Sequence, residues 1–177
     1  MENRMEKDEA YPGYFFDKII DITVDDLRKM GVKAVAVDLD NTTVVDSSFR
    51  MLHGVRKWMK EIRAAGYPFV IVTNTYPVRA WFFSKVMGNI PFFAFAKKPA
   101  PDKLLRAAAH LNVQVSEIAL IGDQLFADVT AANRCGAVSV KVEPYSKEIL
   151  FAKKFRRIRR REKEYLDKRK HYGNQDA

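Results

Sequence analysis

The stretch KAVAVDLDNTT, residues 33–43, places four apolar residues directly before a polar segment that carries Asp38 and Asp40. A short run that is apolar throughout is typical of a strand in a parallel sheet, because helices cover both faces of such a sheet. The stretch therefore predicts a buried strand that delivers two carboxylates at its carboxyl end.

Four more runs of this kind follow along the chain, at residues 68–72, 91–95, 118–121 and 137–142. Segments of helical period lie between them, and the clearest of these ends at Gly66, a residue suited to ending a helix. The alternation predicts an α/β fold with a doubly wound, Rossmann-like parallel sheet of five strands. The composition, 47% hydrophobic and 30% charged over 177 residues, fits one globular domain.

Polar residues follow two of the other strands at the points where those strands end. Thr73 and Asn74 come after the second apolar run, and Asp123 comes after the fourth, with Asp128 five residues later. Ligands and catalytic groups collect at the carboxyl ends of the strands in such sheets. Carboxylates brought together there require a bound cation or a shared proton, and hard oxygen ligands favour Mg²⁺ over softer metals. The pattern therefore predicts a magnesium site.

Four ordered motifs stand near these strand ends: Asp38-Leu-Asp40-Asn-Thr42, Thr73, Lys98-Pro99, and Gly122-Asp123 followed by Asp128. In kind and order they resemble the four motifs of the haloacid dehalogenase superfamily. The DLDNT form, the AKKP segment and GDQLFADVTAANRCG are similar more narrowly to its subfamily IIIA and to the YqeG-type branch, whose relatives include phosphatidylglycerophosphate phosphatases. The similarity extends from near residue 14 to about residue 142.

The resemblance implies a catalytic role for three residues. Asp38 would be the nucleophile that forms an aspartyl-phosphate, and its carboxylate would also bind Mg²⁺. Asp40 would protonate the leaving alkoxide and then activate water, while its backbone carbonyl contacts the metal. Lys98, favoured over Lys97 because it adjoins Pro99, would neutralise the negative charge shared by Asp38 and the phosphoryl group. Phosphoryl transfer requires such positioning and cationic stabilisation.

The resemblance also implies which residues bind the substrate phosphate and the metal. Thr73 and Asn74 would hold phosphoryl oxygens. Asp123 would be a direct metal ligand, and Asp128 would complete the metal shell directly or through water. Together with Asp38 and the Asp40 carbonyl, these acids form the expected Mg²⁺ site.

The spacing of the motifs bears on the substrate. Cap domains of this superfamily are inserted between the first two motifs or between the second and third, and here those intervals hold little beyond one helix, or a helix and a strand. The resemblance thus implies a capless phosphatase domain of residues 1–150, including an N-terminal lead-in. An open site of this kind suits a bulky or macromolecular phosphate ester.

Residues 151–177 form a basic tail. Eleven basic and three acidic residues lie at 153–170, which carry eight of the nine net positive charges of the chain. Apolar residues recur near one helical face of the tail, at Phe151, Phe155, Ile158 and Leu166. A basic amphipathic helix is typical of a membrane-surface element. A phosphatase held at an anionic membrane fits the lipid-phosphate activity that the resemblance implies. We therefore expect a peripheral membrane enzyme that dephosphorylates phosphatidylglycerophosphate.

Two other readings stay open at this point. The tail also suits a nucleic-acid backbone, so the enzyme could act on nucleic-acid ends or nucleotides, or the fold could be a non-catalytic RNA- or ribosome-associated module. The single Cys135 and the acidic opening of the chain indicate an intracellular, cytoplasmic protein without a secretory signal. Because the tail holds none of the expected catalytic residues, its removal should spare hydrolysis of a soluble monoester.

Overall fold

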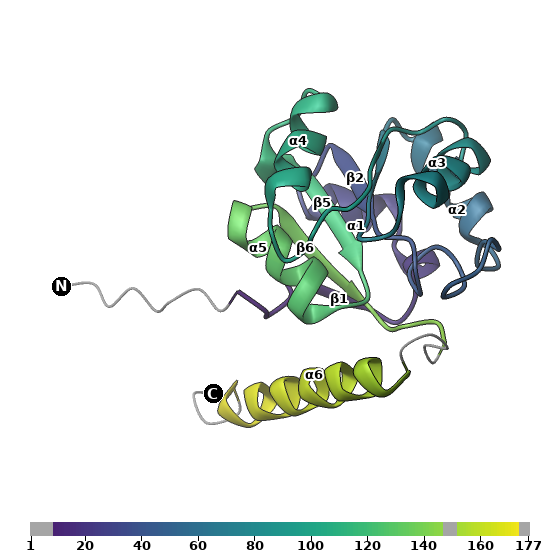
Figure 1. Cartoon of the computed structure of the whole chain (residues 1–177). Coiled ribbons are helices and arrows are strands. Elements are labelled where there is room, and N and C mark those ends of the chain that lie inside the picture. The colour runs from purple at the N-terminus through teal and green to yellow at the C-terminus, as the bar shows by residue number, and fades with distance from the viewer. Residues whose placement is uncertain (1–8, 147–151, 174–177) are drawn as a thin grey trace.

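The structure is a computed structural model that describes residues 9–146 and 152–173. A parallel sheet of six strands forms its centre (Figure 1), in the order β1-β6-β5-β2-β3-β4. The strands are β1 (Tyr14–Phe16), β2 (Ala34–Val37), β3 (Phe69–Val72), β4 (Phe92–Phe93), β5 (Ile118–Gly122) and β6 (Val138–Val142). The central strand β2 leads directly into Asp38 and Asp40, which places both at the carboxyl edge of the sheet.

All five apolar runs form strands, which confirms the predicted parallel α/β sheet, but a sixth strand is present. Strand β1 pairs with β6, with Tyr14 opposite Val140, and extends the sheet at that edge. Its three aromatic residues are too few to show an alternating pattern, so the sequence alone does not distinguish this strand from a loop.

Helices cover both faces of the sheet. They are α1 (Val24–Lys29), α2 (Val55–Ala64), α3 (Pro77–Val86), α4 (Asp102–His110), α5 (Thr130–Cys135) and α6 (Ala152–Gly173), with short helices η1 (Ile19–Asp21), η2 (Val115–Glu117) and the π-helical turn η3 (Leu125–Val129). Val35 and Val37 of β2 join one hydrophobic cluster with α1, α2 and α3. Ala34 and Ala36 join a second cluster with α4 and α5. Successive side chains of β2 thus point to opposite faces of the sheet and pack into different hydrophobic clusters.

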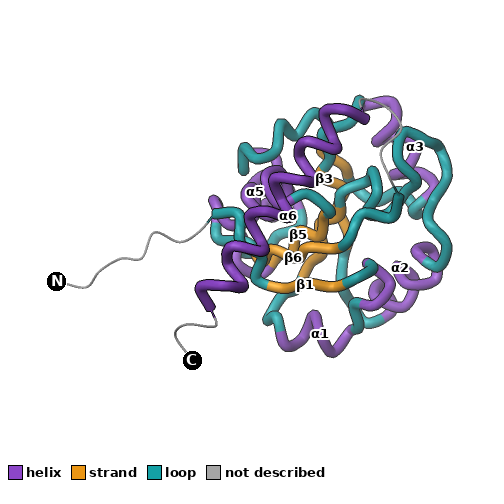
Figure 2. The backbone as a smooth tube through the Cα atoms, turned by 90° about the horizontal axis from the view of Figure 1, so that it is seen from below, coloured by secondary structure: helices purple, strands orange, loops and turns teal. Residues whose placement is uncertain are grey.

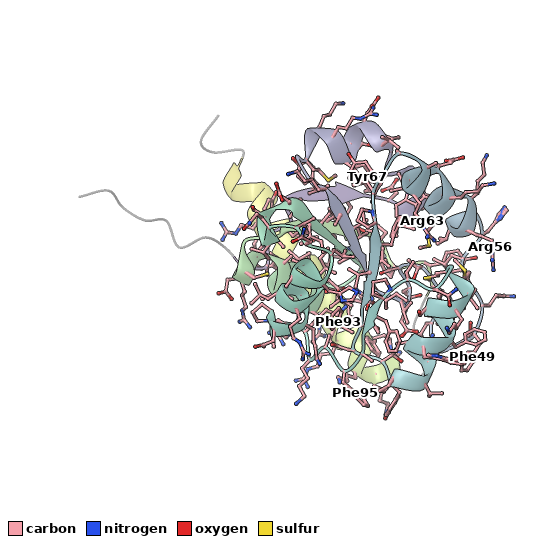
Figure 3. All side chains as sticks on the ribbon, turned by 90° about the horizontal axis from the view of Figure 1, so that it is seen from above. Phe49, Arg56, Arg63, Tyr67, Phe93 and Phe95 are labelled. Atoms are coloured by element: carbon pink, nitrogen blue, oxygen red, sulfur yellow. The ribbon has the colours of Figure 1, made fainter. Side chains whose placement is uncertain are left out.

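Helix α2 contacts the end of α3 through two arginines that Figure 3 labels. Arg56 donates to the carbonyl oxygen of Val86, and Arg63 donates to that of Met87, each at 3.3 Å. Carbonyls at a helix C-terminus lack intrahelical partners and attract cations, so these contacts help fix α2 against α3.

No cap domain interrupts residues 38–117, all of which the structure describes. Between β2 and β3 the chain forms a loop and α2, and between β3 and β5 it forms α3, β4, α4 and η2. The carboxyl edge of the sheet is therefore not enclosed by an inserted domain, as expected.

The basic tail contains the long helix α6, which lies alongside the sheet domain (Figures 1 and 2). Phe155, Ile158 and Leu166 are half-buried, whereas Phe151 lies outside the described residues. The Tyr165 and Phe126 rings meet edge to face at 5.8 Å, so α6 packs against η3. Among the described helices, none has the length and apolarity needed to cross a bilayer.

Candidate active site

Three carboxylates meet at the carboxyl ends of β2 and β5. Asp38, Asp123 and Asp128 each offer an oxygen, and these oxygens all lie within 4.8 Å of one another. All three residues are buried, with exposed fractions of 5%, 1% and 1%. Clustered hard oxygen donors of this kind are the ligand type that Mg²⁺ binds.

Lys98 lies between two of these carboxylates. Its Nζ donates to Asp38 Oδ1 at 2.7 Å and to the carbonyl oxygen of Val72 at 2.8 Å, and it pairs with Asp128 Oδ1 at 2.5 Å. Lys97, by contrast, is exposed. Burial alone would lower the pKa of Lys98, but the carboxylates of Asp128 and Asp38 raise it above its ordinary value, so the side chain is an ammonium ion.

The charges of this cluster fit a divalent cation. Three carboxylates beside one ammonium leave two buried negative charges, which a cation such as Mg²⁺ would neutralise. Burial raises the pKa of Asp38 to about 6, while Lys98 partly opposes the shift. Burial likewise raises the pKa of Asp123 to about 8, against the opposing effect of Arg159. Both carboxyl groups therefore stay protonated to a higher pH than an ordinary aspartate does.

Asp128 is held in place by the backbone around it. The N–H of Gln124 donates to Asp128 Oδ2 at 3.0 Å. A Cβ added at Gly122 would overlap the Asp128 side chain, so the end of β5 accommodates Asp128 only because residue 122 has no side chain. Gly122 is therefore part of the site for a steric reason.

Thr73 and Asn74 lie at the end of β3, beside the cluster. Asn74 Oδ1 accepts from the Lys98 N–H at 2.8 Å, and its Nδ2 donates to the Lys98 carbonyl oxygen at 3.3 Å. These contacts make Asn74 a support for the Lys98 backbone. Thr73 is buried, and its Oγ1 accepts from the Thr75 N–H at 3.3 Å, so its own hydroxyl proton is available for donation.

The Asp40 carboxylate lies apart from the acidic trio. Its Oδ2 accepts from Arg79 at 2.6 Å, and its Oδ1 accepts from the Ser47 N–H at 2.9 Å. Arg79 also donates to the Ser48 carbonyl oxygen at 2.8 Å and lies over the buried ring of Phe83, 5.4 Å from its centroid. Asp40 is thus held at the partly exposed rim of the site.

Three residues near the site were not predicted from the sequence. Arg79 comes from α3, and Arg159 and Glu162 come from α6. Arg159 pairs with the Asp123 carboxylate and donates to the Asp123 carbonyl oxygen at 2.8 Å, while Glu162 accepts from the Leu125 N–H at 2.6 Å. The sequence offered no signal for Arg159, because it is one of several adjacent arginines in the basic tail.

Comparisons with known proteins agree with this arrangement. The family model for haloacid dehalogenase-like hydrolases matches residues 12–136. "Probable phosphatase YqeG" of Bacillus subtilis (strain 168) is 32% identical over 146 residues, which cover 82% of this chain and 84% of that protein. Glyceraldehyde 3-phosphate phosphatase of Pyrococcus abyssi is 32% identical over 101 residues, which cover 51% of this chain and 42% of that protein.

Two solved structures are similar in fold to this chain. An uncharacterized protein from Listeria monocytogenes serotype 4b superposes with a TM-score of 0.54 at 15% identity, covering 61% of this chain and 76% of that chain. The cobalt-bound deoxy-D-mannose-octulosonate 8-phosphate phosphatase of Haemophilus influenzae superposes with a TM-score of 0.50 at 15% identity. The match covers 64% of this chain and 69% of that chain. At such identities these two likenesses support the fold alone. The four motifs lie within the matched residues 12–136, at the strand ends where the acids meet, and the chain therefore belongs to the haloacid dehalogenase-like hydrolase family and is a phosphatase.

Proposed function

We propose that this phosphatase depends on Mg²⁺ and works through an aspartyl-phosphate formed on Asp38. The observation that carries this step is the contact of Lys98 with both Asp38 and Asp128. A buried ammonium beside the attacking carboxylate lowers the cost of bringing a phosphate dianion next to it. Bound Mg²⁺ would supply further positive charge for the phosphoryl oxygens, with Asp38, Asp123 and Asp128 as its side-chain ligands.

We assign the acid and base steps to Asp40. Its carboxylate lies at the rim, where it can reach a leaving oxygen that points toward solvent, and Arg79 and Ser47 fix its orientation. Asp40 would first donate a proton to the leaving alkoxide and then accept one from the water that hydrolyses the aspartyl-phosphate. Thr73 would donate its hydroxyl proton to a phosphoryl oxygen.

We propose a lipid phosphate as the substrate, and the position of α6 is the observation that favours it. The inner face of α6 contacts the active site, while basic residues of its outer face are exposed, among them Lys154, Arg157 and Lys168. Each basic residue near an anionic lipid surface contributes about 1 kcal/mol to binding. A membrane that bound this face would lie beside a site without a cap.

A groove next to α6 is consistent with an amphiphilic ligand. It has a volume of about 780 Å³ and lies between α6 and the β1–β6 edge. Its lining includes Tyr14, Phe15 and Leu166 together with charged residues of both signs, and Lys141 lies 5.3 Å from the Phe15 ring centroid. With the motif resemblance to subfamily IIIA, this environment leads us to propose phosphatidylglycerophosphate as the lipid.

The names of the relatives favour a second candidate, a small soluble phosphate ester. The Pyrococcus abyssi relative is named for glyceraldehyde 3-phosphate, although this chain spans less than half of that protein. Phosphate release should therefore be compared for phosphatidylglycerophosphate in anionic vesicles, glyceraldehyde 3-phosphate and a 5′-phosphorylated oligonucleotide. We expect the vesicle substrate to give the highest kcat/KM, and a higher value for either soluble substrate would reject the lipid proposal.

A charge-reversal variant tests the role of the surface directly. Lys154→Glu/Arg157→Glu/Lys168→Glu alters the outer face of α6 and leaves Arg159 and Glu162 unchanged. We expect it to lose at least about 100-fold in vesicle binding, since about 3 kcal/mol of attraction is removed. The matched control, Lys29→Glu/Lys60→Glu/Arg106→Glu, changes the net charge equally on exposed residues of α1, α2 and α4. Equal losses in both variants would show that α6 has no special role.

A further inference from the structure

Two polar side chains of helix α6 form hydrogen bonds with the segment that carries Asp123. The Arg159 guanidinium donates to the Asp123 carbonyl oxygen at 2.8 Å and also pairs with the Asp123 carboxylate. Glu162 accepts from the Leu125 N–H at 2.6 Å and from Arg159 at 2.9 Å. In Figure 2, α6 crosses the view over the region of β5 and β6. A segment remote in sequence thus holds both the backbone and the side chain of Asp123.

The two carboxylates in these contacts are buried, whereas the Arg159 side chain is 20% exposed. Glu162 is 5% exposed and Asp123 is 1% exposed. A carboxylate is rarely buried unless charged or hydrogen-bonding partners satisfy it. One partner of Glu162 is a backbone N–H of the Asp123 loop, so the burial of Glu162 depends on the position of that loop. The planar guanidinium of Arg159 fixes two acceptors of one residue in a defined geometry, which a lysine ammonium does not.

The Arg159–Glu162 pair adds no net charge to the site. The acidic trio and Lys98 leave two negative charges, and one more cation with one more anion does not change that value. The pair therefore leaves the total charge of the site unchanged, and its direct contacts with Asp123 and Leu125 give it a way to affect a bound cation through the geometry of Asp123.

We propose that Arg159 and Glu162 are positioning residues, which hold Asp123 and the Leu125 backbone in the arrangement that binds the divalent cation. This inference rests on the proposed metal dependence of the phosphatase. Groups that orient a metal ligand commonly change metal affinity 10- to 100-fold when they are removed. The basic tail then has a role inside the active site in addition to any role at a surface.

Loss of the basic tail also removes these two contacts to the active site. The sequence alone predicts that tail removal spares hydrolysis of a soluble monoester, because the tail holds none of the motif residues. The contacts of Arg159 and Glu162 remove the basis for that expectation. Truncation before α6 is now expected to weaken cation binding and to slow turnover of soluble and lipid substrates alike.

The experiment measures binding of Mn²⁺ to the full-length, metal-free protein by electron paramagnetic resonance, with Mg²⁺ as competitor. The principal variant is Arg159→Ala/Glu162→Ala, which keeps the net charge and removes both contacts. Alanine is favourable inside a helix, so α6 keeps its helical propensity. We expect the dissociation constant to rise about 10- to 100-fold.

A matched control lies on the same helix. Arg160 and Glu164 form an exposed pair at 3.6 Å, so Arg160→Ala/Glu164→Ala makes the same chemical change without touching the site. Its Mn²⁺ affinity should stay within about twofold of the wild type, as expected for exposed substitutions.

Single variants separate position from charge. Arg159→Ala leaves three negative charges in place of two, so electrostatics alone would tighten cation binding, whereas loss of positioning weakens it. We expect weaker binding. Arg159→Lys keeps the charge but loses the geometry that binds two acceptors, so we expect it to bind Mn²⁺ more weakly as well. This variant provides the test if the double variant does not fold.

The outcomes are distinguishable. Mn²⁺ affinity unchanged in the double variant, with a wild-type circular dichroism spectrum, would overturn the proposal. Tighter binding would also overturn it and would identify Arg159 as a competitor of the cation for Asp123. If the wild-type protein bound no Mn²⁺, the proposed metal dependence itself would fail, and the inference with it. Substrate assays do not enter this measurement, so an incorrect lipid assignment leaves it unaffected.

Discussion

The carboxylate of Asp40 is joined to the guanidinium of Arg79 at 2.6 Å, with side-chain exposures of 30% and 12%. The two residues come from the loop after β2 and from α3, so the packing of α3 determines where the proposed acid and base points. Arg79 is itself fixed by the Ser48 carbonyl oxygen and the Phe83 ring.

Arg79→Ala should release the Asp40 carboxylate from this orientation. We expect kcat to fall about tenfold, equivalent to about 1.4 kcal/mol, with a smaller change in KM. Steady-state kinetics on a soluble monoester measure both values. Arg50→Ala, which removes an exposed arginine from the same loop region, is the control and should have little effect. A rise in KM with kcat unchanged would instead make Arg79 a substrate-binding residue.

Asp38→Asn should abolish turnover, because the amide cannot attack phosphorus, and it should also prevent formation of a beryllium fluoride adduct. Asp40→Asn should lower kcat about 10²- to 10⁴-fold but still form the adduct, because it removes only proton transfer. Fluorine NMR of the adduct distinguishes the two variants. Turnover in Asp38→Asn within tenfold of the wild type would reject the aspartyl-phosphate mechanism.

Lys98→Met should strongly destabilise the protein in the absence of metal. Removal of the ammonium leaves Asp38 and Asp128 buried without their cation, at a cost of about 3–5 kcal/mol. Urea unfolding in a chelator measures the loss. Lys97→Met is the matched control, because Lys97 is the exposed neighbour, and it should change stability by less than about 0.5 kcal/mol. A similar free energy of unfolding for the two variants would show that Lys98 does not stabilise the acidic cluster.

Gly122→Ala should weaken cation binding, because the added Cβ overlaps the side chain of Asp128. Asp128 is held by Lys98 and by the Gln124 N–H, so its side chain can move away only by losing those contacts. We expect lower Mn²⁺ affinity and lower kcat, with secondary structure retained by circular dichroism. Wild-type Mn²⁺ affinity in this variant would mean that Asp128 is dispensable for the metal site.

The stability of the metal-free protein should fall as the pH rises from 5 to 8. Burial raises the pKa of Asp38 to about 6 and that of Asp123 to about 8, above the ordinary value of 3.8. For an acid whose pKa is raised by folding, the stabilisation is present at low pH and is lost as the pH rises through the folded pKa. Thermal melts in a chelator at several pH values measure this trend.

Mg²⁺ should oppose that loss, because it binds the ionised carboxylates. The increase in melting temperature caused by Mg²⁺ should therefore be larger at pH 8 than at pH 6. An equal increase in melting temperature at both pH values would indicate that the cation does not bind at Asp38 and Asp123.

Much of the fold could be predicted from the sequence because its pattern is local. A continuous apolar run predicts a buried strand, and strands alternating with helices predict a parallel sheet. Since parallel strands end at one edge, the residues after β2 and β5 could be expected to meet, and Asp38, Asp123 and Asp128 do so. The short strand β1 could not be predicted, because three residues carry too little periodic signal.

The sequence by itself thus indicated which polar residues follow the strands and that acidic residues would gather at one edge of the sheet. Only the tertiary structure decided which side chains support the acidic trio. Asn74 binds the Lys98 backbone, Arg79 binds Asp40, and Arg159 reaches Asp123 from the basic tail. These contacts depend on how α3 and α6 pack against the sheet. The several arginines of α6 are alike in sequence, and the packing of the helix decides which of them faces the active site.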